Sequence, residues 1–224
     1  DLDAQRVPFC EALASGGARH ERAQAILALP GFATADPVGE LPPLSRAGSD
    51  ALPCLGAWTS PAAEIADRFL LEIARGCPRR CHFCVSRSTA PGAFRYAPAD
   101  AILDLDLSPW PRLGLVGAAV SDHPQLPALV DGLAARGHAV SLSSLRADRL
   151  DEALLSALAR AGNRRLTLAA DGLGERVRKT IDKGVTRAHL VSAAKSAKAL
   201  GFIALRVYQI VGLPTEQEPD LVEA

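Results

Sequence analysis

The sequence lacks an excess of either charge. Lys plus Arg number 25 and Asp plus Glu number 25 among 224 residues, so the formal net charge is zero. Proteins that bind nucleic acids or anionic membrane surfaces are usually strongly basic. Because the two charges balance, the net charge gives no reason to expect binding to nucleic acids or anionic membranes. A local basic patch could still hold a nucleic acid. Nucleic acid is therefore not indicated as a partner.

Long apolar runs are also missing. A membrane-spanning helix needs about 20 consecutive apolar residues, and no run in this chain approaches that length. The first residues do not combine a basic start with an apolar core, as a secretory signal peptide would. The chain begins at Asp1 and contains no methionine. We expect no membrane association, and we expect the chain to be a fragment of a longer protein.

Cysteine is scarce and unevenly placed. There are five cysteines, an odd number, and Cys77, Cys81 and Cys84 lie within eight positions. A secreted disulfide framework uses an even number of cysteines, whereas a close cluster indicates metal binding or redox chemistry in a reducing compartment. We expect a cytoplasmic protein with a metal or redox site. Cys10 and Cys54 are interpreted as ordinary thiols.

Strand and helix patterns alternate in most of the chain. Strands are expected at residues 69–74, 113–120, 139–145, 166–170 and 202–211, and helical spacing of apolar residues occurs at 126–133, 150–161 and 190–200. Gly137, Gly162 and Gly201 follow these helical patterns, where a left-handed cap favours glycine. This alternation is typical of parallel strands joined by right-handed crossovers.

The predicted strands have two different faces. Arg206 and Tyr208 alternate with Leu205 and Val207 in the last strand, and Ser143 belongs to a similar alternation in the third. An apolar face toward helices and a polar face toward a cavity are typical of a barrel with a ligand inside. A flat doubly wound sheet is the alternative.

The N-terminal part has a different character. Residues 1–30 have loose helical stripes that Gly16-Gly17 interrupts, and residues 30–62 contain six prolines. A connector this long is usually functional or a linker. We expect residues 1–62 to form a helical, Pro-rich N-terminal extension, the tail of an upstream domain, and residues 63–224 to form the main domain. A disordered chain end is the alternative.

The three clustered cysteines directly follow the first predicted strand, with the spacing C-x₃-C-x₂-C. Thiolates are natural ligands of iron–sulfur clusters, and four of them close a 4Fe-4S site. Three leave one iron open to chelate a small molecule, such as S-adenosylmethionine (SAM) through its amino and carboxylate groups. An electron from the cluster would then break a sulfur–carbon bond and give methionine and a 5′-deoxyadenosyl radical.

Two alternatives exist for these cysteines. Three Cys and one His are a recognised zinc ligand set. His82 lies inside the motif, and His123 or His138 could reach it. A redox pair is the second alternative, since the last two cysteines have C-x₂-C spacing, but the first cysteine would then have no role.

The C-x₃-C-x-Φ-C loop, with Phe83 as its aromatic residue, resembles the signature of the radical SAM superfamily. Residues 141–146 (SLSSLR), residues 166–186 and residues 208–216 (YQIVGLPTE) resemble cobalamin-associated members of that superfamily, in the same order. The resemblance covers roughly residues 65–220. Two departures are Ala170-Asp171, where the group usually has Pro-Glu, and residues 116–119, which lack an acidic residue often found there.

The resemblance implies a partial (β/α)₆ TIM-like barrel, of which this chain holds five strands and ends before the sixth. It implies a 4Fe-4S cluster, SAM and reductive SAM cleavage, with cobalamin-dependent methyl or other carbon transfer as the reaction. Methylthiolation of RNA or protein is an alternative, but Cys10 and Cys54 are too few for the second cluster that it needs. A non-catalytic zinc or iron–sulfur module is another alternative.

The resemblance also implies roles for single residues. Cys77, Cys81 and Cys84 are the metal ligands, and the cofactor contacts are Phe83, Gly117, Ser143, Asp171, Arg206 and Gly212. Phe83 contacts adenine through its backbone, Gly117 allows close approach of the methionine end, and Gly212 shapes the loop beside adenine. A strand-end turn is the alternative for Gly117. Asp171 binds the ribose hydroxyls or, alternatively, caps the helix after Gly172.

Other residues have less defined roles. Arg206 and Tyr208 are expected to face the cavity, where Arg206 could hold a carboxylate or phosphate; a buried polar pair is the alternative. Arg79 and Arg80 are interpreted as favouring the anionic cluster or a flavodoxin- or ferredoxin-type reductant, or as solvated charges. Residues 121–123 (Ser-Asp-His) are interpreted as a rim loop, because adjacent residues cannot form a catalytic triad. The substrate is a small molecule or a peptide.

Overall fold

The computed structural model describes residues 6–29, 32, 51–56, 59–60, 62, 67–86 and 94–223. The chain divides into two compact units, residues 1–51 and residues 52–224. No helix within the described ranges is long and apolar enough to cross a membrane. The predicted connector at 30–62 lies mostly outside the described residues, and a domain boundary at residue 62 stays a prediction.

The first unit contains two short helices, α1 (Arg6–Ala14) and α2 (Arg19–Leu27). The turn between them contains Gly16 and Gly17, as the sequence predicts. The rings of Phe9 and Phe32 stack with their centroids 5.5 Å apart.

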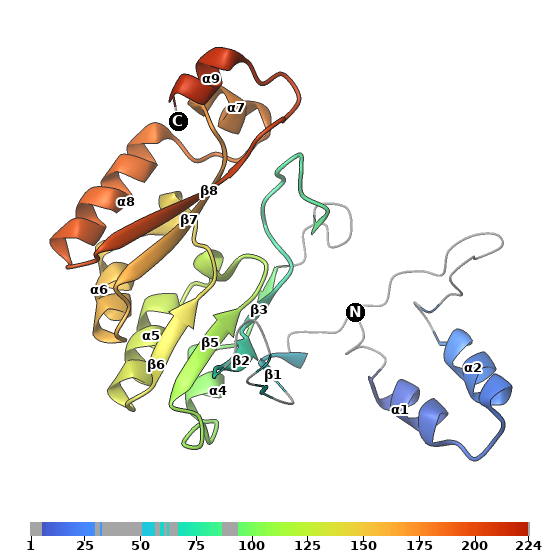
Figure 1. Cartoon of the computed structure of the whole chain (residues 1–224). Coiled ribbons are helices and arrows are strands. Elements are labelled where there is room, and N and C mark those ends of the chain that lie inside the picture. The colour runs from blue at the N-terminus through green and yellow to red at the C-terminus, as the bar shows by residue number, and fades with distance from the viewer. Residues whose placement is uncertain are drawn as a thin grey trace. The chain divides into compact units, whose positions relative to one another are not determined.

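The second unit is built on parallel strands (Figure 1). Strands β1 (Cys54–Leu55), β2 (Phe69–Glu72), β5 (Arg112–Val116) and β6 (Ala139–Leu142) form one sheet in the order β1-β2-β5-β6, in which only β1 is antiparallel to its neighbour. Strands β7 (Arg165–Gly172) and β8 (Ala204–Ile210) pair in parallel. A parallel bridge between Leu145 and Leu168 continues the order from β6 to β7. All five predicted strands are thus present.

The first predicted strand is shorter than expected. It ends at Glu72, and the chain then forms a short antiparallel pair of β3 (Ala74–Arg75) and β4 (Arg95–Tyr96). Ile73 lies between the two strands, where its amide donates to Val116 O at 3.0 Å and its carbonyl accepts from Ala97 N at 2.9 Å. The chain therefore turns away from the sheet just before the first clustered cysteine.

Helices follow the strands as the sequence predicts. They are α4 (Ala99–Leu103), α5 (Leu126–Ala135), α6 (Glu152–Arg160), α7 (Glu175–Thr180), α8 (Arg187–Ala199) and α9 (Glu218–Glu223), with the 3₁₀ turns η3 (Val120–Asp122) and η4 (Ala147–Arg149). The carboxylate of Asp151 accepts from Leu154 N at 2.8 Å and caps α6. Gly137, Gly162 and Gly201 have φ values of 86°, 87° and 80°, as expected for helix ends.

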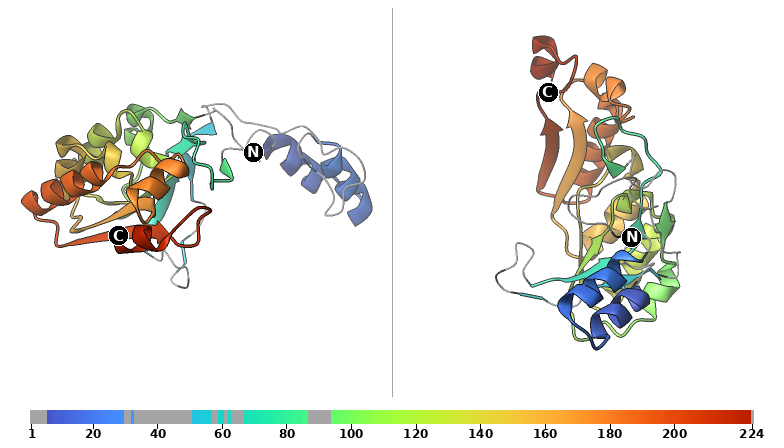
Figure 2. Two further views of the ribbon diagram at one scale, coloured as in Figure 1. Left: turned by 90° about the horizontal axis from the view of Figure 1, so that it is seen from above. Right: turned by 90° about the vertical axis from the view of Figure 1, so that its right-hand side faces the viewer.

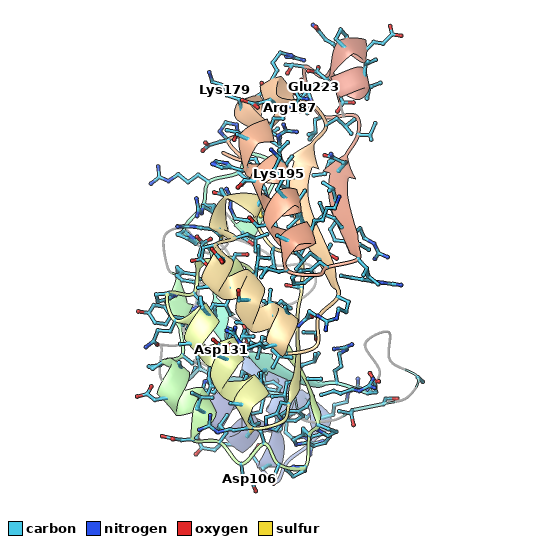
Figure 3. The ribbon with its side chains drawn as sticks, turned by 90° about the vertical axis from the view of Figure 1, so that its left-hand side faces the viewer. Asp106, Asp131, Lys179, Arg187, Lys195 and Glu223 are labelled. Atoms are coloured by element: carbon cyan, nitrogen blue, oxygen red, sulfur yellow. The ribbon has the colours of Figure 1, made fainter. Side chains whose placement is uncertain are left out.

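The two faces of the sheet differ as predicted. Leu71, Leu113, Leu115 and Leu168 are fully buried, and they pack with apolar residues of α5 and α6 in the core. The other face carries Leu70, Gly114 and Ser141, which lie opposite one another in register. Figures 2 and 3 show α5, α6 and α8 along one side of the strands. Asp131, labelled on α5 in Figure 3, forms an ion pair of 2.7 Å with Arg160 of α6.

The order β2-β5-β6-β7-β8 is an open arrangement within the described ranges. The outer strand β8 has exposed side chains, among them Leu205 and Tyr208. Because the five strands are parallel, their carboxyl ends lie along one edge. The loops that leave this edge therefore come together, and they include the cysteine motif.

Candidate metal centre

The cysteine loop, residues 77–84, begins directly after β3. Gly76 precedes it with a φ of 79°, a left-handed conformation that glycine adopts without strain. On the other side of the loop, His82 N donates to Ile181 O at 2.9 Å, and His82 Nδ1 lies 3.0 Å from Thr180 O. The loop is therefore docked on the carboxyl end of α7.

Cys77, Cys81 and Cys84 line one pocket with a volume of about 240 Å³. The remaining walls come from the cysteine loop itself, from the loops after β5 and β6, from β7 and from the loop between α7 and α8. They include Arg79, Phe83, Ala119, Ser121, Ser144, Arg146, Ala169, Asp171 and Lys183. The structure thus brings the three predicted metal ligands together at the carboxyl ends of the parallel strands. Phe83, a predicted cofactor contact, lies at the same pocket with 41% of its surface exposed.

The three thiols differ in exposure. Cys81 is 7% exposed, and Cys77 and Cys84 are half-buried. Burial raises the pKa of the Cys81 thiol, and the positive charges of Lys183 and Arg146 act in the opposite direction. The amide of Arg79 donates to Cys77 Sγ at 3.4 Å. The pocket therefore offers both cationic groups and a backbone donor to thiolate ligands.

The histidines are engaged elsewhere. Besides His82, His123 is 3% exposed and its Nε2 lies 2.8 Å from Ala97 O, while His138 Nδ1 lies 2.9 Å from Trp110 O. A zinc ion needs four ligand atoms at about 2.0–2.3 Å from one point. Among the described residues, no three His, Cys, Asp or Glu side chains form a group that could hold a metal ion.

The donor set nevertheless fits an iron–sulfur cluster. Each cysteine of a 4Fe-4S cluster binds a different iron, so the sulfur atoms need not converge on one point. Three thiols on one loop beside a cavity meet that requirement. The three thiols therefore fit the ligand set of such a cluster.

Asp171, in β7, lines the same pocket as the three cysteines. Its φ is 64°, and the register of β7 with β8 shifts between Ala169 and Asp171. Its Oδ2 accepts from Lys183 Nζ at 2.5 Å. The residue that caps α7 is Gly174, so the alternative prediction that Asp171 caps this helix is wrong.

Gly117, Ser143 and Gly212 lie outside the walls of the cysteine pocket. A Cβ on Gly117 would lie 2.4 Å from Ala74 O, so this glycine allows a close approach of the chain to itself. Ser143 lines a separate hollow of about 290 Å³ together with Arg68 and other residues. Gly212 has a φ of 84°, and its amide donates to Glu216 Oε1 at 3.1 Å.

Arg206 and Tyr208 lie on the polar face of β8. Tyr208 pairs in register with Ala169, which lines the cysteine pocket, and Arg206 pairs with Thr167. Both side chains are exposed, with 49% of Tyr208 accessible. In the described part of the chain they do not form the buried polar pair considered as an alternative.

The predicted rim loop reaches the pocket. Ser121 lines it, and its Oγ accepts from Arg146 N at 3.1 Å. Asp122 instead binds Arg79 and Arg149, and His123 turns toward Ala97 O, so the three residues act separately. Arg80 is exposed, as a solvated charge would be.

Sequence reasoning missed Arg146 and Lys183 as site residues. Arg146 is 8% exposed, and its Nη2 donates to Lys183 O at 2.6 Å. Lys183 is 7% exposed. Both lie in mixed polar segments, SSLRADR (143–149) and IDKGV (181–185), so no local pattern indicates that they are buried.

The comparisons with known proteins agree with this architecture. The model of the Radical SAM superfamily matches residues 71–224. The uncharacterized protein MJ0966 of Methanocaldococcus jannaschii is 33% identical over 174 residues, which cover 74% of this chain and 37% of that protein. The chain therefore spans little more than a third of the length of this relative.

Two solved structures show the same fold. One is the cobalamin-dependent S-adenosylmethionine radical enzyme OxsB with aqua-cobalamin and S-adenosylmethionine bound (TM-score 0.56, 21% identity, 69% of this chain and 25% of that chain). The other is the radical S-adenosylmethionine methyltransferase TsrM from Kitasatospora setae (TM-score 0.52, 17% identity, 66% of this chain and 31% of that chain). With the family model covering more than half of its length, the chain belongs to the radical SAM superfamily.

Proposed function

We propose that the second unit binds a 4Fe-4S cluster through Cys77, Cys81 and Cys84, binds SAM in the adjoining space, and cleaves it reductively. The observation that carries this proposal is that the three thiols line one pocket at the carboxyl ends of the parallel strands. Membership of the superfamily implies the same two cofactors. When bound, they supply a 5′-deoxyadenosyl radical, and the protein supplies position and shelter from water.

The chain's own residues would share this work. Cys81 is buried and offers a ligand shielded from solvent. Lys183 and Arg146 bring positive charge to a pocket that receives anionic ligands. Asp171 Oδ2 accepts from Lys183, which leaves Oδ1 to accept from a hydroxyl group of the SAM ribose. Phe83 supplies a partly exposed apolar surface beside the second and third cysteines.

We further propose that the whole protein performs cobalamin-dependent methyl or other carbon transfer. Residues 141–146, 166–186 and 208–216 support this, since they resemble cobalamin-associated members of the superfamily. Arg206 and Tyr208 lie on the same sheet face as residues of the pocket and would contact a small-molecule or peptide substrate. A flavodoxin- or ferredoxin-type protein would supply the electron.

Anaerobic reconstitution of the full-length protein tests the proposal. Wild type and the control variants Cys10→Ala and Cys54→Ala should bind about four iron per chain with matching sulfide. Cys77→Ala, Cys81→Ala and Cys84→Ala should each lose the intact cluster. With SAM and a reductant, the loaded wild type should form 5′-deoxyadenosine.

Several results would contradict it. One tightly bound zinc and no iron would reject the cluster, and a loaded full-length protein that forms no 5′-deoxyadenosine would reject the radical step. Addition of cobalamin with analysis of the product separates carbon transfer from methylthiolation, because only the latter adds sulfur to the substrate.

A further inference from the structure

We propose that Asp122 is a positioning residue for the cysteine loop. It holds the side chain of Arg79 and thereby fixes the first turn of the loop, with Cys77, in an arrangement that is ready to accept the cluster. The inference rests on the proposed function, because it treats residues 77–84 as the cluster-binding loop.

The carboxylate of Asp122 is buried between two arginines from different parts of the chain. Its side chain is 3% exposed. Oδ1 accepts from Arg79 Nη2 at 2.5 Å and from Arg149 Nε at 2.8 Å, and Oδ2 lies 3.3 Å from Arg79 Nε. A buried carboxylate requires such partners, and a two-point contact with arginine fixes orientation as well as distance. Asp122 therefore constrains the position of Arg79 strongly.

Arg79 transmits this constraint to the first cysteine. It lies two residues after Cys77, and its amide donates to Cys77 Sγ at 3.4 Å. Its side chain is 27% exposed, so the pair with Asp122 is partly sheltered from solvent. A second carboxylate, Asp148, lies 3.8 Å from Arg79 Nη1.

Among the described residues, two side-chain contacts anchor the loop, one on each side of Cys81. The anchor after Cys81 uses His82, which bonds to the main-chain oxygens of residues 180 and 181. The anchor before Cys81 is formed by Arg79, whose guanidinium contacts Asp122, at the end of η3, at two points and Asp148 at a longer distance. Without the contact with Asp122 this anchor would be weaker, and cluster binding would have to order more of the turn at Cys77.

Asp122 also binds Arg149, and this second contact provides a matched control. Arg149 belongs to η4 and is 49% exposed. If Asp122 only stabilised its surroundings, removal of either arginine would have similar effects. If it acts on the loop through Arg79, only the loss of Arg79 should affect the cluster.

The test uses the reconstituted full-length protein and the rate at which it loses iron to a ferrous chelator. Arg79→Ala and Asp122→Asn should each raise this rate about tenfold, the size expected for loss of one charge-assisted contact. The double variant should lose iron no faster than either single variant, and Arg149→Ala should match wild type. In the apo protein, the same two variants should alkylate faster at Cys77 than wild type and Arg149→Ala do. The thermal transitions of Arg79→Ala and Arg149→Ala should both fall, because each variant removes one partner of the buried Asp122 carboxylate.

The inference fails if Arg79→Ala retains iron as well as wild type, if Arg149→Ala has the larger effect, or if the effects of Arg79→Ala and Asp122→Asn add. If Asp122→Asn does not fold, Arg79→Ala and Arg79→Lys still test the inference. Lysine restores the positive charge at position 79 but not the two-point contact with Asp122. If the wild-type protein bound no cluster, the proposed function would fail, whereas alkylation of Cys77 in the apo protein would still test the anchor.

Discussion

Lys183 and Asp171 form an ion pair inside the pocket, with Lys183 Nζ donating to Asp171 Oδ2 at 2.5 Å. The two side chains are 7% and 15% exposed. Arg146 holds the main-chain oxygen of Lys183 at 2.6 Å, and Arg178 binds the oxygen of Val185 at 2.8 Å. The segment that carries the lysine is therefore fixed, and the pair joins the loop before α8 to the end of β7.

Breaking this pair should destabilise the second unit. Lys183→Met leaves the Asp171 carboxylate mostly buried without its partner, which costs about 3 kcal/mol for pairs of this kind. The double variant with Asp171→Asn should recover part of that loss. Denaturant unfolding measures the free energy of unfolding of the single variant and of the double variant. Asp131→Asn is the control, because Asp131 and Arg160 are 42% and 59% exposed, and it should cost less than about 1 kcal/mol. Equal effects of Lys183→Met and Asp131→Asn would contradict the prediction.

Gly117 and Gly114 offer a matched pair of glycine substitutions in and just after β5. In Gly117→Ala the new Cβ would lie 2.4 Å from Ala74 O, a main-chain atom that cannot move alone. In Gly114→Ala it would lie 2.7 Å from Leu70 Cδ2, the end of a side chain that can rotate. We expect Gly117→Ala to lower the free energy of unfolding by about 1–3 kcal/mol and Gly114→Ala by less. Thermal unfolding of the two variants measures this order, and the reverse order would show that the approach to Ala74 is not tight.

Much of the fold could be predicted from the sequence because the apolar pattern is regular. Leu113 and Leu115 alternate with Gly114, and this period of two gives both the strand and its buried face. The helix ends were predictable from single glycines such as Gly162, whose φ is 87°. The break at Ile73 was not, since it depends on hydrogen bonds to Val116 and Ala97, which are distant in the sequence.

The candidate site was only partly predictable, because some of its contacts join residues that are distant in the sequence. The cysteine spacing is local, so the three cysteines that line the pocket could be identified directly. Ser143 was expected at the cofactor, but the strand turns after Leu142, and Ser144 lines the pocket instead. The pairing of Lys183 with Asp171 requires the loop before α8 to fold back on β7, which no periodic pattern encodes.

Burial of Cys81 predicts an order of reactivity in the apo protein. Cys81 is 7% exposed, Cys77 and Cys84 are half-buried, and Cys10 is exposed. Under limiting iodoacetamide, Cys10 should react fastest and Cys81 slowest, by about tenfold or more, since an alkylating reagent must reach the sulfur. Mass spectrometry of the peptides measures each rate. In the cluster-loaded protein, Cys77, Cys81 and Cys84 should all be protected while Cys10 still reacts. Equal rates at Cys10 and Cys81 in the folded apo protein would contradict the prediction.

His123 should make the stability of the second unit fall as the pH drops below about 6.5. Its ring is satisfied in the neutral form, since Nε2 donates to Ala97 O at 2.8 Å and Nδ1 accepts from Gln125 N at 3.1 Å. Burial is the main reason why the pKa of His123 is lowered from its ordinary value of 6.5. Below pH 6.5 the unfolded chain therefore binds a proton that the folded chain does not, and this favours unfolding until the lower folded pKa is reached.

The measurement is the free energy of unfolding in urea between pH 7.5 and pH 5.5, above the range in which carboxylates titrate. His123→Gln should be less stable at neutral pH, because it loses a well-packed ring, but its stability should depend less on pH than that of wild type. If His123→Gln and wild type lose stability in parallel over this interval, the acid sensitivity arises from another group.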